Sequence, residues 1–214
     1  MDRKVINEKD IKYVINRYKE RIKEFGLTFD SLKSGSTNKQ NIRHAIHSSS
    51  FRTESPSILD IGCGMGDFLI YLQENKIPNS YQGYDIVPEY INYCKANYPK
   101  EKFEVRNVFE NGIDGTYDNI ILSQVLNNRY SFSDNMDVMK QMMTICNNHC
   151  TVGFSIDMMS EYVDFKNDEL YYYSPEKIFT FAKTLSKRVL LRHDFRPYEF
   201  CIQVFKMDAP GFVV

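Results

Sequence analysis

The sequence predicts an α/β protein built on a doubly wound sheet, and three observations support this fold class. From residue 57 onward, short apolar runs typical of buried strands alternate with segments of helical periodicity. Gly62, Gly64 and Gly66 lie between the first of these strands and the helix that follows it. Near the C-terminus, the strand-like runs 188–193 and 199–206 have a short connection, which implies an antiparallel pair.

Residues 1–52 are expected to form a helical lid, and residues 53–214 one structural unit. Residues 8–25 place apolar side chains on one helical stripe that Gly26 ends, and residues 27–52 predict a loop and a short helix. Residues 1–52 hold twelve Lys and Arg against six Asp and Glu, a net charge of +6. This excess indicates either a solvated helix face or a basic lid that attracts an anionic substrate.

The glycine-rich turn is the most informative part of the sequence. Residues 57–61 read as a buried strand and residues 67–73 as a helix, and glycine is needed where the backbone approaches a ligand or takes a positive φ. The third glycine comes one position earlier than in the fingerprint of dinucleotide sites. Asp60 and Asp67 would also repel a pyrophosphate. The turn therefore favours a ligand that has no phosphate and carries a cationic or amine-bearing end, and it disfavours a nicotinamide-dependent oxidoreductase.

The remaining elements alternate in the same way. Pro88 and Pro99 bracket one helix, and a stripe of methionines on another is typical of a core face. In chain order we expect a strand at 81–86, a helix at 89–98, strands at 103–108 and 117–123, a helix from Ser133 or Asp134, a strand at 151–155 and a helix from Ser174.

These motifs resemble the class I S-adenosylmethionine-dependent methyltransferases over about residues 57–155. Residues 59–67 resemble the family's first motif, and Asp85 stands where the family places its acceptor for the ribose hydroxyls. Asn107 departs from the family, which often carries Asp there. The resemblance implies a Rossmann-like sheet of seven strands in the order 3-2-1-4-5-7-6, with strand 7 antiparallel. It also implies S-adenosyl-L-methionine as the cofactor, bound by Asp60, Gly62, Cys63, Gly64, Gly66, Asp85, Ile86, Asn107, Val108 and Ser123.

A narrower resemblance links the sequence to a group of small bacterial methyltransferases whose acceptor is unassigned. It is carried by residues 168–176, 191–194 and 198–200, and by Gly35, Ser36, Gln40 and Arg43. Arg43 is the expected partner of the cofactor carboxylate, because a guanidinium binds a carboxylate bidentately.

The acceptor is expected to lie under three segments, 27–47, 124–133 and 156–173. The third segment is long and rich in aromatic and acidic residues, as functional loops often are. An oxygen nucleophile usually needs a base, whereas an amine needs only to arrive neutral. Candidate bases are His193, Tyr172 and Asp157, and candidate acceptor contacts are Tyr18, Asn127, Tyr172 and His193. Structural roles for the histidine and the tyrosines remain open.

Composition narrows the function classes further. The five cysteines are scattered and odd in number, and the first residues lack an apolar signal core, so we expect a cytoplasmic protein with reduced thiols. No metal is expected, because the spacing of Cys146 and Cys150 is not a usual zinc spacing and only Asp157 suits a metal-dependent methyltransferase. No run approaches membrane-spanning length, and the net charge of −1 argues against a polyanion-binding protein.

The sequence thus predicts an enzyme that transfers a methyl group from S-adenosylmethionine to oxygen or nitrogen of a small-molecule acceptor. Two alternatives stay open: a methyltransferase acting on nucleic acid or protein, and a catalytically silent module that binds S-adenosylmethionine. The acceptor and the oligomeric state are not specified by the sequence.

Overall fold

The structure is a computed structural model that describes residues 5–32 and 37–208. Gly35 and Ser36, which carry part of the narrower resemblance, lie outside these ranges. Within them, no helix has the length and apolar character needed to cross a membrane. The elements are α1 (Glu8–Phe25), η1 (Phe29–Leu32), α2 (Thr37–Ser48), β1 (Ser57–Ile61), α3 (Asp67–Glu74), β2 (Ser80–Asp85), α4 (Pro88–Asn97), β3 (Lys102–Val105), α5 (Val108–Asn111), β4 (Tyr117–Ser123), α6 (Asn135–His149), β5 (Cys150–Met159), α7 (Pro175–Leu185), β6 (Arg188–Arg196) and β7 (Glu199–Phe205).

The seven strands form a single sheet in the order β3-β2-β1-β4-β5-β7-β6. Five strands pair in parallel, and β7 is antiparallel to both of its neighbours, β5 and β6. This confirms the predicted fold class, strand order and antiparallel seventh strand. The order reverses beside β1, which is where an open α/β sheet leaves a crevice at the carboxyl ends of its strands.

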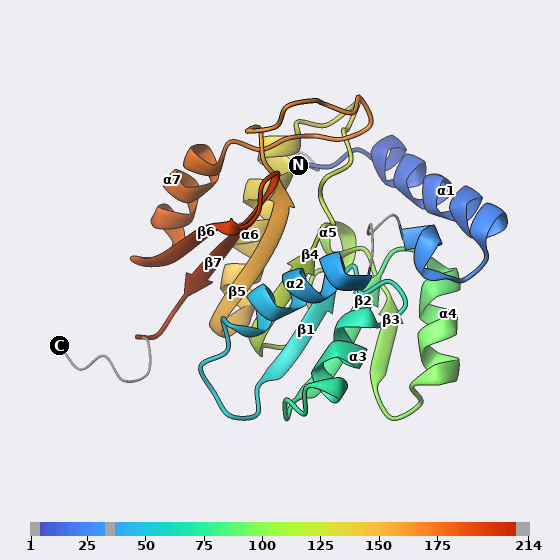
Figure 1. Ribbon diagram of the computed structural model, residues 1–214, viewed down its shortest axis with the longest axis horizontal. Helices are drawn as coiled ribbons and strands as arrows, with labels where there is room; N and C mark the ends of the chain where they lie inside the picture. The colour runs from blue at the N-terminus through green and yellow to red at the C-terminus, as the bar shows by residue number, and fades with distance from the viewer. Residues whose placement is uncertain (1–4, 33–36, 209–214) are drawn as a thin grey trace.

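Helices cover both faces of the sheet, as Figure 1 shows. On one face, Ile58 and Ile121 pack with residues of α3 and α4. On the other face, Leu59 and Ile120 pack with the methionine stripe of α6 and with α7. Because successive side chains of a strand point to opposite faces, the short buried strands β1 and β4 contribute to both cores.

The helix ends predicted at Gly26, Asp134 and Ser174 are present, and Asn7 adds an N-cap that was not predicted. The side chains of Asn7, Asp134 and Ser174 accept hydrogen bonds from backbone amides and cap α1, α6 and α7, and Gly26 ends α1 with φ +69°. A carboxylate or hydroxyl at the N-cap satisfies an amide that would otherwise lack a partner.

Several elements differ from the sequence-based expectation, and two of the differences bear on the site. β5 continues to Met159 rather than ending at residue 155, so Asp157 lies inside the sheet and not in the loop above it. The polar residues that alternate along β5 and β7 face α2, which buries them: Ser155, Asp157, Glu199, Cys201 and Gln203 are all at most 3% exposed. Alternation of this kind usually indicates a solvated sheet face, but here a polar helix covers it.

Candidate active site

One cavity lies between α1 and the carboxyl ends of β1, β2 and β4. It gathers ten of the eleven residues expected to hold the cofactor, and the walls also include apolar side chains of α1 and the loop after β4. The ten are Asp60, Gly62, Cys63, Gly64, Asp85, Ile86, Asn107, Val108, Ser123 and Arg43. Gly66 is the exception, because it is the left-handed N-cap of α3 and packs beside Tyr98.

The glycine turn is tied to the end of β2. The amides of Gly62 and Cys63 donate to the Tyr84 carbonyl at 2.7 and 3.0 Å, and the Gly64 amide donates to the Asp85 carboxylate at 2.9 Å. Gly64 has φ +54°, and a Cβ there would lie 3.0 Å from Leu32. The turn therefore needs glycine for its backbone conformation and for its close packing.

Three carboxylates line the cavity, and burial dominates the pKa of each. Burial raises the pKa of Asp60 to about 7, although Tyr81 donates a hydrogen bond to this carboxylate at 2.7 Å. Burial also raises the pKa of Asp85 to about 6, against the hydrogen bonds from Val87 and Gly64. The pKa of Asp67 is raised by burial as well, with Gln40 opposing the shift. A cationic ligand would stabilise the ionised form of all three.

Asn107 lines the cavity and carries an unpartnered donor. Its Oδ1 accepts the Phe109 amide at 3.1 Å and caps α5, an element that the sequence did not predict. Its buried Nδ2 has no hydrogen-bond partner. The side-chain oxygen of Asn107 is therefore already used within the protein, and its N–H group remains for a ligand. Ring nitrogens of a purine are acceptors that match such a donor.

A second cavity adjoins the first and shares with it Tyr18, Leu32, Arg43 and Gln124. Its remaining walls come from α1, from the loop after β4 and from the loop after β5, and are mainly amide and apolar side chains: Arg17, Asn127, Asn128, Met159, Asn167 and Leu170. Arg17 donates to Asn128 at 2.7 Å and pairs with Glu169 at 2.6 Å. The guanidinium charge on this wall is thus balanced from within the protein.

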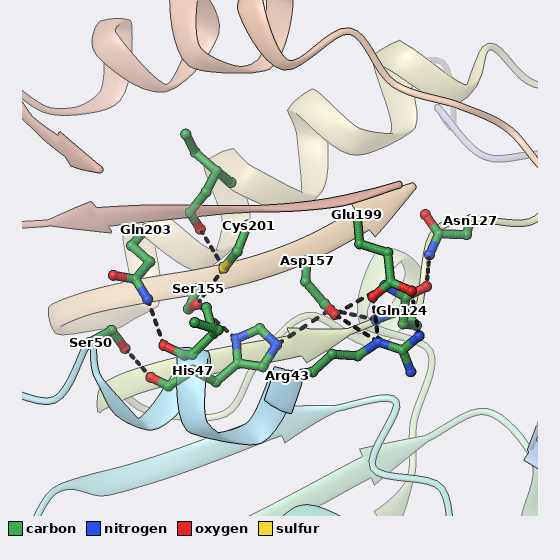
Figure 2. Close-up of polar contacts among 12 residues, drawn as sticks. Arg43, His47, Ser50, Gln124, Asn127, Ser155, Asp157, Glu199, Cys201 and Gln203 are labelled. Atoms are coloured by element: carbon green, nitrogen blue, oxygen red, sulfur yellow. Dashed lines mark hydrogen bonds and ion pairs between the residues drawn. The ribbon is translucent and has the colours of Figure 1, made fainter. Parts of the chain in front are cut away.

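Arg43, which lines both cavities, belongs to a buried ionic network with residues of β5 and β7 (Figure 2). Arg43 donates from Nε and one terminal nitrogen to the two oxygens of Glu199, each at 2.7 Å, and its Nε lies 3.7 Å from Asp157. On the other side of Asp157, Nε2 of His47 lies 3.3 Å from a carboxylate oxygen. Burial opposes the charged form of each group. The ion pairs outweigh burial, so the pKa of Asp157 is held well below its usual range and that of His47 is raised.

The structure separates the residues that the sequence analysis grouped around the acceptor. Tyr18 lines both cavities and Asn127 lines the second. Tyr172 accepts a hydrogen bond from the Asn167 amide at 2.8 Å, and His193 packs on β6 against Tyr162 and Phe200. Neither Tyr172 nor His193 is among the residues that line either cavity.

Three cavity residues lie in segments that were expected over the acceptor, but the sequence analysis gave none of them a role in the site. Gln40 and His44 of α2 line the first cavity together with Arg43, and Gln124 lines both cavities. Burial, and secondarily the neighbouring His47, lowers the pKa of His44 to about 3, so this imidazole is neutral at physiological pH. The sequence did carry a signal for the residues of α2, because positions 40, 43, 44 and 47 are polar and share one face of a helix.

Comparison with known proteins shows that the sequence is similar to methyltransferases. A family model described as a methyltransferase domain matches residues 12–149. A Mycobacterium tuberculosis protein whose name describes it as a methyltransferase is 30% identical over 155 residues, which is 70% of this chain and 93% of that protein.

Two solved structures share the fold. Magnesium protoporphyrin IX methyltransferase from Synechocystis, with bound S-adenosylhomocysteine (SAH), superposes with a TM-score of 0.64 at 12% identity and covers 91% of this chain and 95% of its own. Human N-acetylserotonin methyltransferase, in complex with S-adenosylmethionine (SAM), has a TM-score of 0.65 at 14% identity, and the match covers 94% of this chain and 60% of the human chain.

Proposed function

The chain belongs to the methyltransferase-domain family of class I, S-adenosylmethionine-dependent enzymes, and on that premise we propose that it methylates oxygen or nitrogen of a small-molecule acceptor. The proposal rests on two adjoining cavities that share Tyr18 and Gln124 in their walls. The first is lined by carboxylates and by the glycine turn, and the second mainly by amide side chains. When bound, the cofactor supplies an electrophilic methyl group on a sulfonium.

The first cavity suits this cofactor in charge and in hydrogen bonding. Asp60, Asp67 and Asp85 favour a ligand with a sulfonium and an ammonium, and they oppose the pyrophosphate of a dinucleotide. The unpartnered Nδ2 of Asn107 fits a purine nitrogen, and the Asp85 carboxylate lies at the strand end where a ribose diol can donate to it. We assign to these residues, with the glycine turn and Ser123, the binding of the cofactor.

The second cavity is the proposed place of the acceptor. It opens beside the cofactor cavity and is lined by Tyr18 and Asn127, which we assign to acceptor binding. The pKa of Tyr18 is raised by burial and then by Asp85, so its phenol keeps its proton and is available to donate a hydrogen bond to the acceptor. Methyl transfer from a sulfonium depends mainly on alignment of the two reactants, which walls fixed by hydrogen bonds provide.

Residues 1–52 are the proposed lid over both cavities. Helix α1 contributes Val14 and Tyr18 to the cofactor cavity, and the Asp10 carboxylate accepts hydrogen bonds from Ser131 and Ser133 after β4. The guanidinium groups of Arg17 and Arg21 donate hydrogen bonds to Asn128 and to the Ser31 carbonyl within the protein. These two cations are therefore less available to an external phosphate. This favours a small acceptor over a nucleic acid, whose binding requires cations that are available to phosphates.

Transfer of radiolabel tests the proposal. The protein is incubated with methyl-tritiated S-adenosylmethionine and an extract of its source cells that has been separated by size into small molecules, nucleic acid and protein. Label is expected in a small-molecule product that is chromatographically distinct from S-adenosylmethionine, and unlabelled S-adenosylhomocysteine should form in equal amount. Label confined to nucleic acid or protein would support the macromolecular alternative, and binding without any transfer would support a silent module.

A further inference from the structure

Gln124 has an unusual backbone conformation at the boundary between the two cavities. It follows the last residue of β4 and has φ +60°, in the left-handed region that side chains other than glycine, asparagine and aspartate seldom adopt. It lines both cavities. A conformation of this kind persists only where surrounding interactions hold it, and it often marks a functional position.

Asp157 supplies those interactions from the neighbouring strand β5. The backbone amide of Gln124 donates to Oδ1 of Asp157 at 2.8 Å, and its side-chain amide donates to Oδ2 at 3.0 Å. One carboxylate therefore binds Gln124 at two points. An ionised carboxylate is the stronger acceptor of both hydrogen bonds, because neither of its oxygens carries a proton.

The charge of Asp157 is maintained on the opposite side of the carboxylate by α2. His47 lies at 3.3 Å and Arg43 at 3.7 Å, and Asp157 is 1% exposed (Figure 2). Since a buried carboxylate without partners is costly, the two cations make it possible for Asp157 to remain ionised. Helix α2 is thus linked through Asp157 to the turn after β4.

The turn at Gln124 shapes both cavities. It directs Val125 onto the glycine turn, where a Cβ on Gly62 would lie 2.5 Å from the valine side chain. Its side-chain oxygen accepts from Asn127 at 2.8 Å, and Asn127 in turn accepts the Met159 amide at 3.0 Å. The cofactor wall and the acceptor wall are therefore set by the same residue.

We propose that Asp157 is a positioning residue, whose carboxylate holds Gln124 in its left-handed conformation and thereby fixes the wall between the methyl donor and the acceptor. Asp157 acts through Gln124 and touches neither reactant, so it is not the general base. The inference rests on the proposed function, because it presumes that S-adenosylmethionine occupies the first cavity.

A double-mutant cycle tests the inference, with the dissociation constant of S-adenosylhomocysteine as the readout. Asp157→Asn removes one of the two acceptors, whereas Gln124→Gly removes the side chain and makes the left-handed backbone inexpensive. We expect Asp157→Asn to weaken binding about tenfold in the parent protein and less than about threefold in the Gln124→Gly protein. A purely structural role of Asp157 would give equal losses in both backgrounds, and equal losses would overturn the inference.

A second pair of variants leaves Asp157 intact, in case Asp157→Asn does not fold. Gln124→Gly and Gln124→Val both lack the side-chain amide, but only valine resists the left-handed conformation. Binding should be about tenfold weaker with valine than with glycine, and equal affinities would contradict the inference. If the parent protein does not bind S-adenosylhomocysteine, the proposed function fails and the inference fails with it. If the parent binds but the effects of Asp157→Asn and Gln124→Gly are additive, only the inference is overturned.

Discussion

Asp85 ends β2 with two backbone amides on its carboxylate and still faces the cavity. We expect Asp85→Ala to weaken the binding of S-adenosylmethionine by about 1.5–3 kcal/mol, the scale of a lost hydrogen bond to a charged group. Isothermal titration calorimetry measures the change. Asp194→Ala is the matched control, because this carboxylate is exposed and pairs with the nearby Arg192. Equal affinities of the two variants would remove Asp85 from the cofactor site.

Asp60 should make cofactor binding depend on pH. Burial raises its pKa to about 7 in the free protein, and a bound cation should lower that pKa because it favours the carboxylate. Binding should therefore release a proton near pH 6–7, and affinity should rise with pH through this range and level off above about pH 8. Calorimetry in buffers of different ionisation enthalpy counts the protons released. Asp60→Asn should abolish the part of the release that is due to Asp60, and an unchanged release would refute this assignment.

The same raised pKa has an effect on stability. The folded protein binds the Asp60 proton more tightly than the unfolded chain does. The contribution of Asp60 to the free energy of unfolding is therefore fully present below the ordinary pKa of an aspartate, and it is lost as the pH rises through about 7. Without ligand, Asp60→Asn should raise the melting temperature at pH 8 more than at pH 4. A larger gain at pH 4 would show that the sign of this effect is wrong.

At the scale of elements, the glycine turn gives a prediction with a matched control. Gly64→Val should abolish cofactor binding, because the new side chain meets Leu32 and fills the cavity. Gly115→Val imposes a similar backbone penalty, since Gly115 has φ +76°, but a Cβ there meets nothing within 4 Å. Calorimetry should find binding lost only in the first variant. Loss in both, or in neither, would mean that the turn is not part of the site.

The elements also mark the limits of what the sequence could predict. Helix ends followed from glycine, proline and capping residues, because those signals are local. The strand order followed from the family resemblance. The polar face of β5 and β7 was not predictable as buried, because its partners Arg43 and His47 lie more than 100 positions away in α2. For the same reason, Asp157 resembled a loop carboxylate that could act as a base, whereas β5 extends past it.

For the whole molecule, the lid and the sheet should be separable in function. Removing residues 1–32 deletes α1 and η1 but keeps α2, whose Arg43 and His47 neutralise buried carboxylates. The shortened protein should lose only the far-ultraviolet circular dichroism that α1 and η1 contribute, bind S-adenosylhomocysteine more weakly and lose methyl transfer. A deletion through residue 47 would also strip α2 from the sheet and is a poorer test. Full transfer activity in the shortened protein would show that the first 32 residues do not form part of the acceptor site.

The account as a whole depends on which cofactor enters the cavity at the carboxyl ends of β1, β2 and β4. Calorimetric titration of the full chain with S-adenosylmethionine, and separately with NADH, tests this most directly. The three carboxylates and the early third glycine predict a dissociation constant on the order of micromolar for S-adenosylmethionine and no detectable binding of NADH. Tight binding of NADH with no response to S-adenosylmethionine would contradict the central claim.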